Sequence, residues 1–360
     1  MDGCRLPLSA VSRRALCALL LAGLPAGAAW AAGQTLRVLA WPGYAEPEVV
    51  QAFEKKTGAK VELTVIDTDE ALWHKLSQRA GPAFDVFAVN TAELQRYRAA
   101  GLVQPVDPAL VPNARQQLPR FRDRAAIPGL VAGHGAEAKV LAIPFTYAEM
   151  GLIYDRHQFS QPPDSLQALW DPRWQGKVIA YNGGSHNFSL AAQMLGAESP
   201  FRLPPALRPK AVDKLIELRR NVLGFYSEPN ESVKLFQRHG AALMYANYGR
   251  QQYQLLKAAG ADVGYAIPRE GALAWLDCWA IPAASRQRAL AHAWIDHLLG
   301  RQASSLLVSR QGLAATTAES AASAGAHRLL WLEPVEDAGQ RELMWSRIRS
   351  GDRAARVLAP

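Results

Sequence analysis

Apolar and polar positions along the first hundred residues predict strands and helices in turn. Short apolar runs bounded by turn residues indicate buried strands, and apolar positions spaced three and four apart indicate helices with one buried face. The predicted elements, in chain order, are a strand at 36–41, a helix from Pro47 to Gly58, a strand at 61–66, a helix from Asp69 to Gly81, a strand at 84–89 and a helix at 91–100. This repetition favours a mostly parallel sheet covered by helices on both faces.

The rest of the chain predicts a second lobe of the same kind. Residues 105–140 contain five prolines and three glycines, which indicates a connection with little regular structure. Beyond it, strands are predicted at 140–144, 150–154, 177–181, 241–245, 261–267 and 275–281, and helices at 188–195, 209–221, 231–239, 286–300 and 302–310. We therefore expect an α/β protein whose chain crosses between two lobes near 143–146 and 275–277. The expected division is lobe 1 at 32–143 and 277–315, and lobe 2 at 144–276 and 316–360.

Composition favours a two-lobed globular chain and argues against nucleic-acid binding. Hydrophobic residues make up 49% of the 360 residues, and a single core stops growing at roughly 250–300 residues. The formal charge is +8, yet the basic residues are scattered and never form a run of five or six. Because phosphate binding concentrates Lys and Arg on one face or tail, we predict no nucleic-acid partner.

Residues 1–31 are predicted to be a cleaved secretory signal. Arg13 and Arg14 precede an apolar run that is too short for a membrane span, and small residues follow it as far as Ala31. Cleavage after Ala31 removes Asp2 and three arginines, which lowers the formal charge to +6. The mature chain is expected to be periplasmic and monomeric. Both the general secretory and the twin-arginine export routes stay open.

Cysteine usage excludes disulfide stapling of the mature chain. Cys4 and Cys17 lie in the signal, so only Cys278 remains and no intrachain disulfide can form. The same count excludes a metal site of the CxxC type. Cys278 is interpreted as a buried apolar filler, and neither a metal nor a cofactor is predicted.

Candidate binding residues are expected where the strands of an open α/β sheet end, because ligands bind beyond the carboxyl ends of such strands. The positions after the predicted strands, together with the strand at the second crossing, are rich in aromatic rings and amides and poor in acid–base pairs. The residues singled out are Trp41, Tyr44, Asn90, Gly184, Ser185, His186, Tyr245, Trp275 and Asp277. Asp277 interrupts an apolar strand and needs a partner there, either a ligand ammonium or a structural arginine.

Four of these residues suit a small amine. Aromatic faces such as those of Trp41, Tyr44 and Trp275 attract organic cations by about 0.5–2 kcal/mol each. A buried carboxylate fixes an ammonium, and truncating one partner of such a pair costs about 2–5 kcal/mol. With Asp277 as that carboxylate, the pattern predicts an amine-binding site.

The segment from Gly183 to His186, between a strand and a helix, has a second interpretation. Backbone N–H groups at a helix start bind anions, and glycine allows close approach. Gly184, Ser185 and His186 would then hold a ligand carboxylate or phosphonate. An ordinary glycine-rich turn with a side-chain cap is the simpler alternative.

Enzymatic activity is not predicted. Ser185 and His186 are adjacent, so their side chains diverge and form a poor nucleophile–base pair. The motifs GxSxG, HExxH and GxGxxG and the phosphate-binding loop are absent from the sequence. Tyr245, Tyr248 and Tyr253 could ligate ferric iron, but no carboxylate or histidine partner has a suitable spacing. Iron binding and an exported enzyme remain less favoured alternatives.

Several segments, in order from about residue 35 to 315, share the motifs of one known family. They are 36–44, 53–61, 84–86, 142–145, 169–177, 268–271 and 275–282. The most specific are Trp-Asp-Pro-x-Trp-x-Gly-Lys at 170–177 and Pro-x-Glu-Gly, followed by Trp-x-Asp, at 268–277. In these segments the chain resembles the periplasmic spermidine/putrescine-binding proteins. The final 45 residues resemble them less.

The resemblance implies a two-lobed periplasmic-binding-protein fold with the ligand cleft between the lobes. It further implies closure around a polyamine and delivery to the membrane permease of an ABC importer. The family's aromatic and acidic positions are matched by Trp41, Tyr44, Trp275 and Asp277, and Tyr245 replaces a family tryptophan.

Two departures from the family pattern concern charge. Pro42 and Gly43 occupy a position that is acidic in the family, and Gly183 and His186 stand where the family carries carboxylates. We therefore weigh putrescine or spermidine against a zwitterionic amine whose anionic end lies near 183–187. An amino acid, an opine or an aminophosphonate would be such a ligand.

Overall fold

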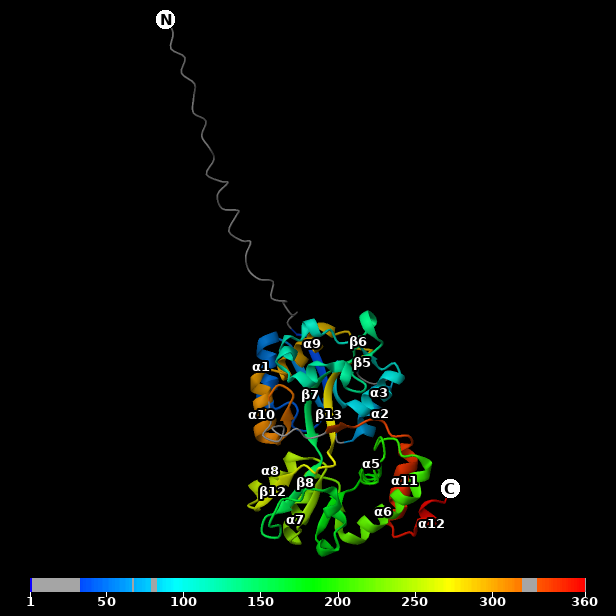
Figure 1. The fold of residues 1–360 in the computed structure, drawn as a ribbon. Helices are drawn as coiled ribbons and strands as arrows, with labels where there is room; N and C mark the ends of the chain where they lie inside the picture. Colours follow the sequence, from blue (N-terminus) through cyan, green and yellow to red (C-terminus); the bar gives the residue numbers. More distant parts are fainter. Residues whose placement is uncertain (2–32, 67, 79–82, 319–328, 360) are drawn as a thin grey trace.

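The computed structural model describes Met1 and residues 33–66, 68–78, 83–318 and 329–359, which form two α/β lobes stacked one above the other (Figure 1). Each lobe is built around its own sheet, one of eight strands and one of five in the described residues. This confirms the predicted fold class. The signal predicted at 1–31 lies outside the described residues except for Met1.

The first lobe contains the eight-stranded sheet. Neighbouring strands follow the order β14–β7–β13–β3–β1–β2, and β4 and β15 also pair with β13. The strands are β1 (Thr35–Ala40), β2 (Lys60–Val65), β3 (Val86–Asn90), β4 (Val103–Gln104), β7 (Ala142–Glu149), β13 (Ala272–Pro282), β14 (Ala314–Ala315) and β15 (Leu329–Trp331). β1 runs parallel to β2 and β3, whereas β13 runs antiparallel to β3 and β7.

Helices cover both faces of the first sheet, as predicted. Along β1, Leu36 and Val38 enter one buried cluster and Leu39 enters another on the opposite face. Helices α1 (Pro47–Thr57), α9 (Arg288–Leu298) and α10 (Arg301–Gln311) contribute to the first cluster. Helices α2 (Asp69–Ser77), α3 (Thr91–Ala99) and α4 (Pro119–Arg122) contribute to the second. Burial on both faces explains why β1 is apolar at most of its positions.

The second lobe contains the five-stranded sheet, in the order β10–β9–β11–β8–β12. Its strands are β8 (Gly151–Asp155), β9 (Val178–Tyr181), β10 (Val222–Tyr226), β11 (Leu243–Ala246) and β12 (Val263–Ala266). Helices α5 (Gly184–Met194), α6 (Arg208–Asn221), α11 (Ala338–Arg349) and α12 (Ala354–Val357) pack on one face, and α7 (Pro229–Arg238) and α8 (Arg250–Ala258) pack on the other. Helix α5 begins four residues earlier than predicted.

The chain passes between the two lobes at three places in the described residues. Met150 separates β7 from β8, residues 267–271 join β12 to β13, and residues 332–337 lead from β15 to α11. The crossings were expected near 143–146 and 275–277, but β7 and β13 pair with each other in the first sheet over nearly their whole length. Figure 1 shows both strands extending between the first lobe and the junction.

One tyrosine ties the two sides of the first crossing together. The hydroxyl of Tyr265 donates a hydrogen bond to the carbonyl of Glu149, at 2.6 Å, and accepts one from the N–H of Gly151, at 3.1 Å. Met150, between these two residues, is fully buried. Tyr265 therefore braces the backbone at the point where the chain leaves one lobe for the other.

The connection at 105–140 is built mainly from short 3₁₀ turns, in agreement with its many prolines. It also holds a small two-stranded sheet, β5 (Val131–Ala132) and β6 (Lys139–Val140). Among the described residues, no helix combines the length and the apolar character needed to cross a membrane.

Candidate ligand-binding site

Asp277 lies in the middle of β13, between two other strands of the first sheet. Its register partners are Asn90, at the end of β3, and Thr146 in β7, and the register with β7 shifts immediately after it. Carboxylate Oδ2 of Asp277 accepts a hydrogen bond of 2.5 Å from the hydroxyl of Tyr44. Only 7% of Asp277 and 6% of Tyr44 is exposed. An acidic group is thus held within an apolar strand by a single phenol.

The environment of Asp277 destabilises its charged form. Burial raises the pKa of its carboxyl to about 7, and the hydrogen bond from Tyr44 opposes part of that rise. Among the described residues, no basic side chain contributes to the shift, so the structural arginine left open above is not its partner. A cation brought in from outside would stabilise the charged form.

Asn90, the register partner of Asp277, contacts a second carboxylate, that of Asp69. Its Oδ1 accepts from the N–H of Glu93 and caps α3, while its Nδ2 donates to Oδ1 of Asp69 at 3.2 Å. Thr68, rather than Asp69, caps α2 by accepting from the N–H of Ala71. Burial and the neighbouring Asp277 raise the pKa of the Tyr44 hydroxyl, and the charge of Asp69 raises it further.

Two of the predicted tryptophans, Trp275 and Trp41, lie in or directly after strands of the first sheet. Trp275 packs against the core of the first lobe and against that of the second, and its indole N–H donates to the carbonyl of Asn247 at 3.1 Å. Trp41, just beyond β1, is half-buried, and its indole nitrogen has no hydrogen-bond partner among the described residues. Both rings come from strand positions that the sequence had singled out.

Tyr245 lies deeper than a ligand contact would require. It is 1% exposed within the core of the second lobe, and its hydroxyl donates to the sulfur of Met150 at 3.6 Å. Its backbone carbonyl accepts from the hydroxyl of Tyr226. Because Met150 is the first crossing, Tyr245 contacts the junction between the lobes from within the second-lobe core.

The start of α5 is occupied by a carboxylate of the same chain. The N–H of Gly184 donates to Oε2 of Glu342, in α11, at 3.0 Å. Arg341, next to it, donates to the carbonyl of Ser185 at 3.2 Å. Burial, followed by the charge of Arg341, lowers the pKa of His186 to about 4. The helix start expected to bind a ligand anion therefore already holds an internal one.

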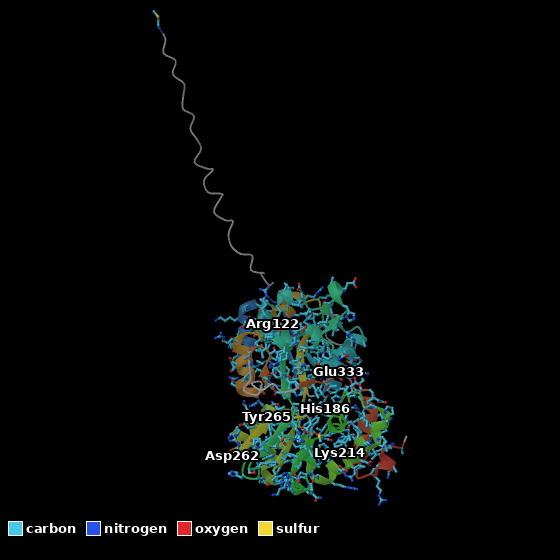
Figure 2. The ribbon with its side chains drawn as sticks, in the orientation of Figure 1. Arg122, His186, Lys214, Asp262, Tyr265 and Glu333 are labelled. Atoms are coloured by element: carbon cyan, nitrogen blue, oxygen red, sulfur yellow. The ribbon has the colours of Figure 1, made fainter. Side chains whose placement is uncertain are left out.

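Tyr181, at the end of β9, marks the region where the lobes face each other. Burial raises the pKa of its hydroxyl, and the charges of Asp69, Glu228 and Glu342 raise it further. Asp69 belongs to the first lobe, whereas Tyr181 and the other two acids belong to the second. The ring of Tyr181 also packs edge-on against His186 at 5.3 Å. Figure 2 shows His186 on the side of the second lobe that faces the first.

The structure groups the predicted residues into two sets. Tyr44 is hydrogen-bonded to Asp277, Asn90 is the register partner of Asp277 in β3, and Trp275 lies two positions along the same strand. Gly184, Ser185 and His186 lie on the second lobe, beside α11. Sequence reasoning missed Asp69, Tyr181 and Glu342 as candidates. The strand-end rule could have found the first two, whereas Glu342 carries no local signal.

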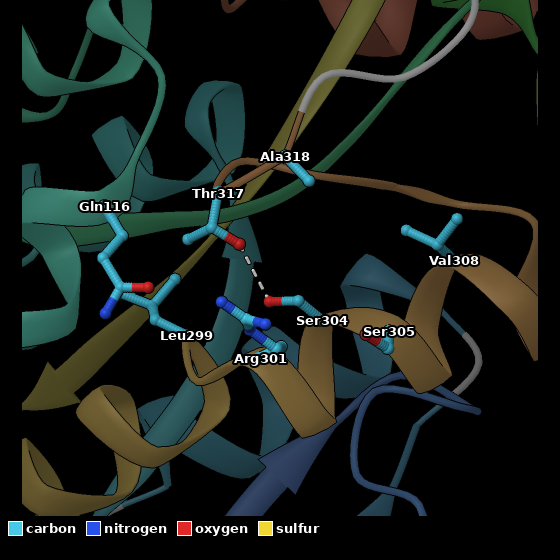
Figure 3. A pocket seen from close by; sticks show the side chains of 8 residues that line it. All are labelled: Gln116, Leu299, Arg301, Ser304, Ser305, Val308, Thr317 and Ala318. Carbon is cyan, nitrogen blue, oxygen red and sulfur yellow. Dashed lines mark hydrogen bonds between the residues drawn. The ribbon is translucent and has the colours of Figure 1, made fainter.

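Three further features of the described residues are possible metal-binding groups, the Cys278 thiol and a surface hollow. No group of three or more His, Cys, Asp or Glu side chains is arranged to hold a metal ion there. Cys278 is a buried free thiol. A hollow of about 420 Å³ lies on the first lobe, away from the predicted residues (Figure 3). Its lining consists of Gln116, Leu299, Arg301, Ser304, Ser305, Val308, Thr317 and Ala318.

The chain belongs to the family of bacterial extracellular solute-binding proteins, whose sequence pattern matches residues 48–329. Its relatives include the putrescine-binding periplasmic protein of Escherichia coli strain K12, 28% identical over 300 residues that cover 78% of this chain and 79% of that protein. The putrescine/agmatine-binding protein of Pseudomonas aeruginosa is 25% identical over 309 residues, covering 79% and 80% of the two chains.

A solved structure shares the two-lobed fold. The spermidine/putrescine ABC transporter substrate-binding protein from Streptococcus pneumoniae superposes with a TM-score of 0.69 at 19% identity, covering 88% of this chain and 99% of that one. The resemblance to periplasmic spermidine/putrescine-binding proteins is thereby confirmed, and so is the periplasmic-binding-protein fold.

Proposed function

We propose that this chain is the periplasmic solute-binding component of an ABC importer and that its ligand is a small diamine of the putrescine class. The observation that carries the proposal is the buried Asp277 carboxylate, which has Tyr44 as its hydrogen-bond partner and no basic residue influencing its pKa among the described residues. The names of the relatives in Escherichia coli and Pseudomonas aeruginosa support the same ligand class.

In this proposal Asp277 pairs with one ammonium group of the ligand. Tyr44 keeps the carboxylate oriented through its hydrogen bond, and the rings of Trp41 and Trp275 supply aromatic faces for the cation. Tyr245 acts indirectly, by packing under Met150 at the crossing. The ammonium supplies the positive charge that the buried carboxylate otherwise lacks.

The second ammonium is proposed to lie beside Tyr181. Asp69, in the first lobe, and Glu342, in the second, are both close enough to Tyr181 for their charges to raise the pKa of its hydroxyl beyond the effect of burial. A cation beside Tyr181 would therefore be attracted by a carboxylate of each lobe. His186 is neutral at pH 7, because its pKa is lowered to about 4, and it adds no opposing charge. This second acidic region favours a diamine over a ligand with a single amine.

Capture is proposed to occur by closure of the lobes around the ligand. The lobes were expected at 32–143 with 277–315 and at 144–276 with 316–360. Because β7, β13 and β15 pair within the first sheet, we propose instead that the lobes move about the crossings at Met150, 267–271 and 332–337. Because Asp69 and Glu342 lie on different lobes, a ligand that contacts both favours the closed form.

Calorimetric titration of the exported protein with putrescine, agmatine, spermidine and 4-aminobutyrate tests the proposal. Asp277→Asn should weaken diamine binding by about 30-fold or more, since one partner of a buried ion pair is lost. Asp262→Asn is the matched control, because Asp262 lies on the surface of the second lobe and pairs with Arg156. Unchanged affinity in Asp277→Asn would show that the amine site is assigned wrongly.

The same titrations separate the alternatives. Tighter binding of an amino acid, an opine or an aminophosphonate than of putrescine would favour the zwitterion hypothesis, and saturable binding of ferric iron would favour an iron-binding protein. We propose a binding role without catalysis, so each ligand should be recovered chemically unchanged after prolonged incubation.

We also propose export with cleavage after Ala31, a monomeric mature chain and no nucleic-acid partner. An intact-mass measurement of the periplasmic protein tests the cleavage site. Light scattering after gel filtration tests the monomer, and retention of DNA by the protein at physiological salt would contradict the last proposal.

A further inference from the structure

Helix α11 approaches the start of α5 at unusually short range. Gly184 has no side chain, and a Cβ at this position would lie 2.9 Å from the carbonyl oxygen of Arg341 and 2.6 Å from Oε2 of Glu342. Contacts below 3.0 Å between a Cβ and a backbone atom require a shift of the structure. The glycine therefore serves the packing of α11, which brings the Glu342 carboxylate onto the first N–H of α5.

Buried polar contacts fix the position of Glu342. The fully buried Arg341 forms a 2.7 Å ion pair with Glu336 and donates to Oγ of Ser189 at 2.9 Å. One turn further along α11, the indole N–H of Trp345 donates to Oδ1 of Asn182 at 3.1 Å. Although Glu342 itself is exposed, the residues on either side of it hold its backbone against α5.

A helix start with free N–H groups attracts carboxylates and phosphates. In this chain Glu342 already satisfies the N–H of Gly184 and leaves a negative charge beside it. A ligand carboxylate would have to displace Glu342 and would be repelled by it, whereas a ligand ammonium would be attracted. Asp69 adds the same sign of charge from the opposite lobe.

We propose that Glu342 is a specificity-determining residue, which admits a ligand whose second end is cationic and excludes one whose second end is a carboxylate. The proposal rests on the function proposed above and adds what decides between the two ligand classes. Specificity of this kind comes from a repulsive element built against the wrong ligand as well as from attraction to the right one.

The test compares putrescine with 4-aminobutyrate, which has a similar length but carries a carboxylate at one end. Glu342→Gln keeps an oxygen that can accept the hydrogen bond from the N–H of Gly184 and removes only the charge. Glu342→Ala removes both the charge and the acceptor of that hydrogen bond. Glu217→Gln, at an exposed position of α6, makes the same chemical change away from the site. Circular dichroism and thermal melting of each variant check the fold.

We expect the preference for putrescine over 4-aminobutyrate to fall about tenfold in Glu342→Gln, more in Glu342→Ala, and not at all in Glu217→Gln. An unchanged preference in both Glu342 variants, or an equal loss of affinity for both ligands, overturns the proposal. Wild-type protein that prefers 4-aminobutyrate overturns it as well, even if Asp277→Asn confirms an amine site. If Asp277→Asn binds as tightly as wild type while the preference still shifts, the assignment of Asp277 fails and that of Glu342 stands.

Discussion

The hydroxyl of Tyr44 donates a 2.5 Å hydrogen bond to the carboxylate of Asp277 across 233 positions of the chain. This contact joins the loop after β1 to the middle of β13, and both residues are buried. It favours the charged form of a carboxylate whose pKa burial raises, and in the proposed site the same carboxylate also receives the ligand cation. The following predictions concern this contact and the elements that position it.

Affinity for an amine should depend on pH through Asp277. With a pKa of about 7 in the free protein, the carboxyl is protonated at lower pH, and an ammonium ligand must displace that proton. The dissociation constant should therefore rise as pH falls below 7, by up to about tenfold for each pH unit. Calorimetry in buffers of different ionisation enthalpy should also detect proton release. Affinity that is constant between pH 5.5 and 8 would contradict this assignment.

Asp277→Asn should be more stable than wild type at alkaline pH. The carboxyl has a pKa of about 7 in the folded chain against 3.8 when exposed, so the folded state binds more protons between these values and loses stability as pH rises through them. By pH 8 the penalty is on the order of 4 kcal/mol. Urea unfolding of both proteins at pH 4 and pH 8 measures it. The free energy of unfolding of the variant should exceed that of wild type at pH 8 and differ little from it at pH 4.

Tyr44→Phe should move the pH dependence of binding upward. The hydrogen bond from Tyr44 opposes the rise in the pKa of Asp277, so its loss raises that pKa further. A hydrogen bond to a charged group contributes about 1.5–3 kcal/mol, so affinity near pH 7 should fall by about 10-fold or more. Above pH 9 the loss should be smaller. A loss that is equal at every pH would indicate a packing role for the ring.

Tyr265→Phe should alter the kinetics of ligand capture. Without the hydroxyl, the N–H of Gly151 and the carbonyl of Glu149 both lose their hydrogen bonds to Tyr265 at the first crossing. We expect the free energy of unfolding to fall by about 1–3 kcal/mol, and both association and dissociation rates to change. Stopped-flow tryptophan fluorescence measures the rates. Tyr253→Phe, on the neighbouring helix α8, is the control and should leave them unchanged.

Gly184→Ala should loosen the packing of α11 against α5. The added Cβ would collide with the backbone of Arg341, and relief requires α11 to move away from α5. Overpacking of this kind costs about 1–3 kcal/mol. Gly224→Ala is the matched control, since a Cβ at Gly224 has no atom within 4 Å. Hydrogen exchange in α11 should increase in the first variant only.

The sequence alone determined the class of fold and singled out the residues around Asp277 on which the proposed site depends. β1, apart from Thr35 and Arg37, and β3, apart from Asn90 at its end, are apolar because both faces of the sheet are buried, and that pattern is local enough to be recognised without a structure. Asp277 could be found because a carboxylate in an apolar strand is conspicuous. Trp41, Tyr44 and Trp275 could be found because they lie at strand ends or in the strand of the crossing.

Only the tertiary structure decided what surrounds these residues. Thr68 caps α2, while Asp69 accepts a hydrogen bond from Asn90 and its charge adds to the rise that burial causes in the pKa of Tyr181 on the other lobe. Glu342 lies 158 positions along the chain from Gly184, whose N–H donates to it at the start of α5. In the sequence, Glu342 and its polar neighbours look like the exposed residues of any helix. Local patterns record which face of an element is buried. The position of charges from distant elements depends on how those elements pack, and no periodicity in the sequence records that packing.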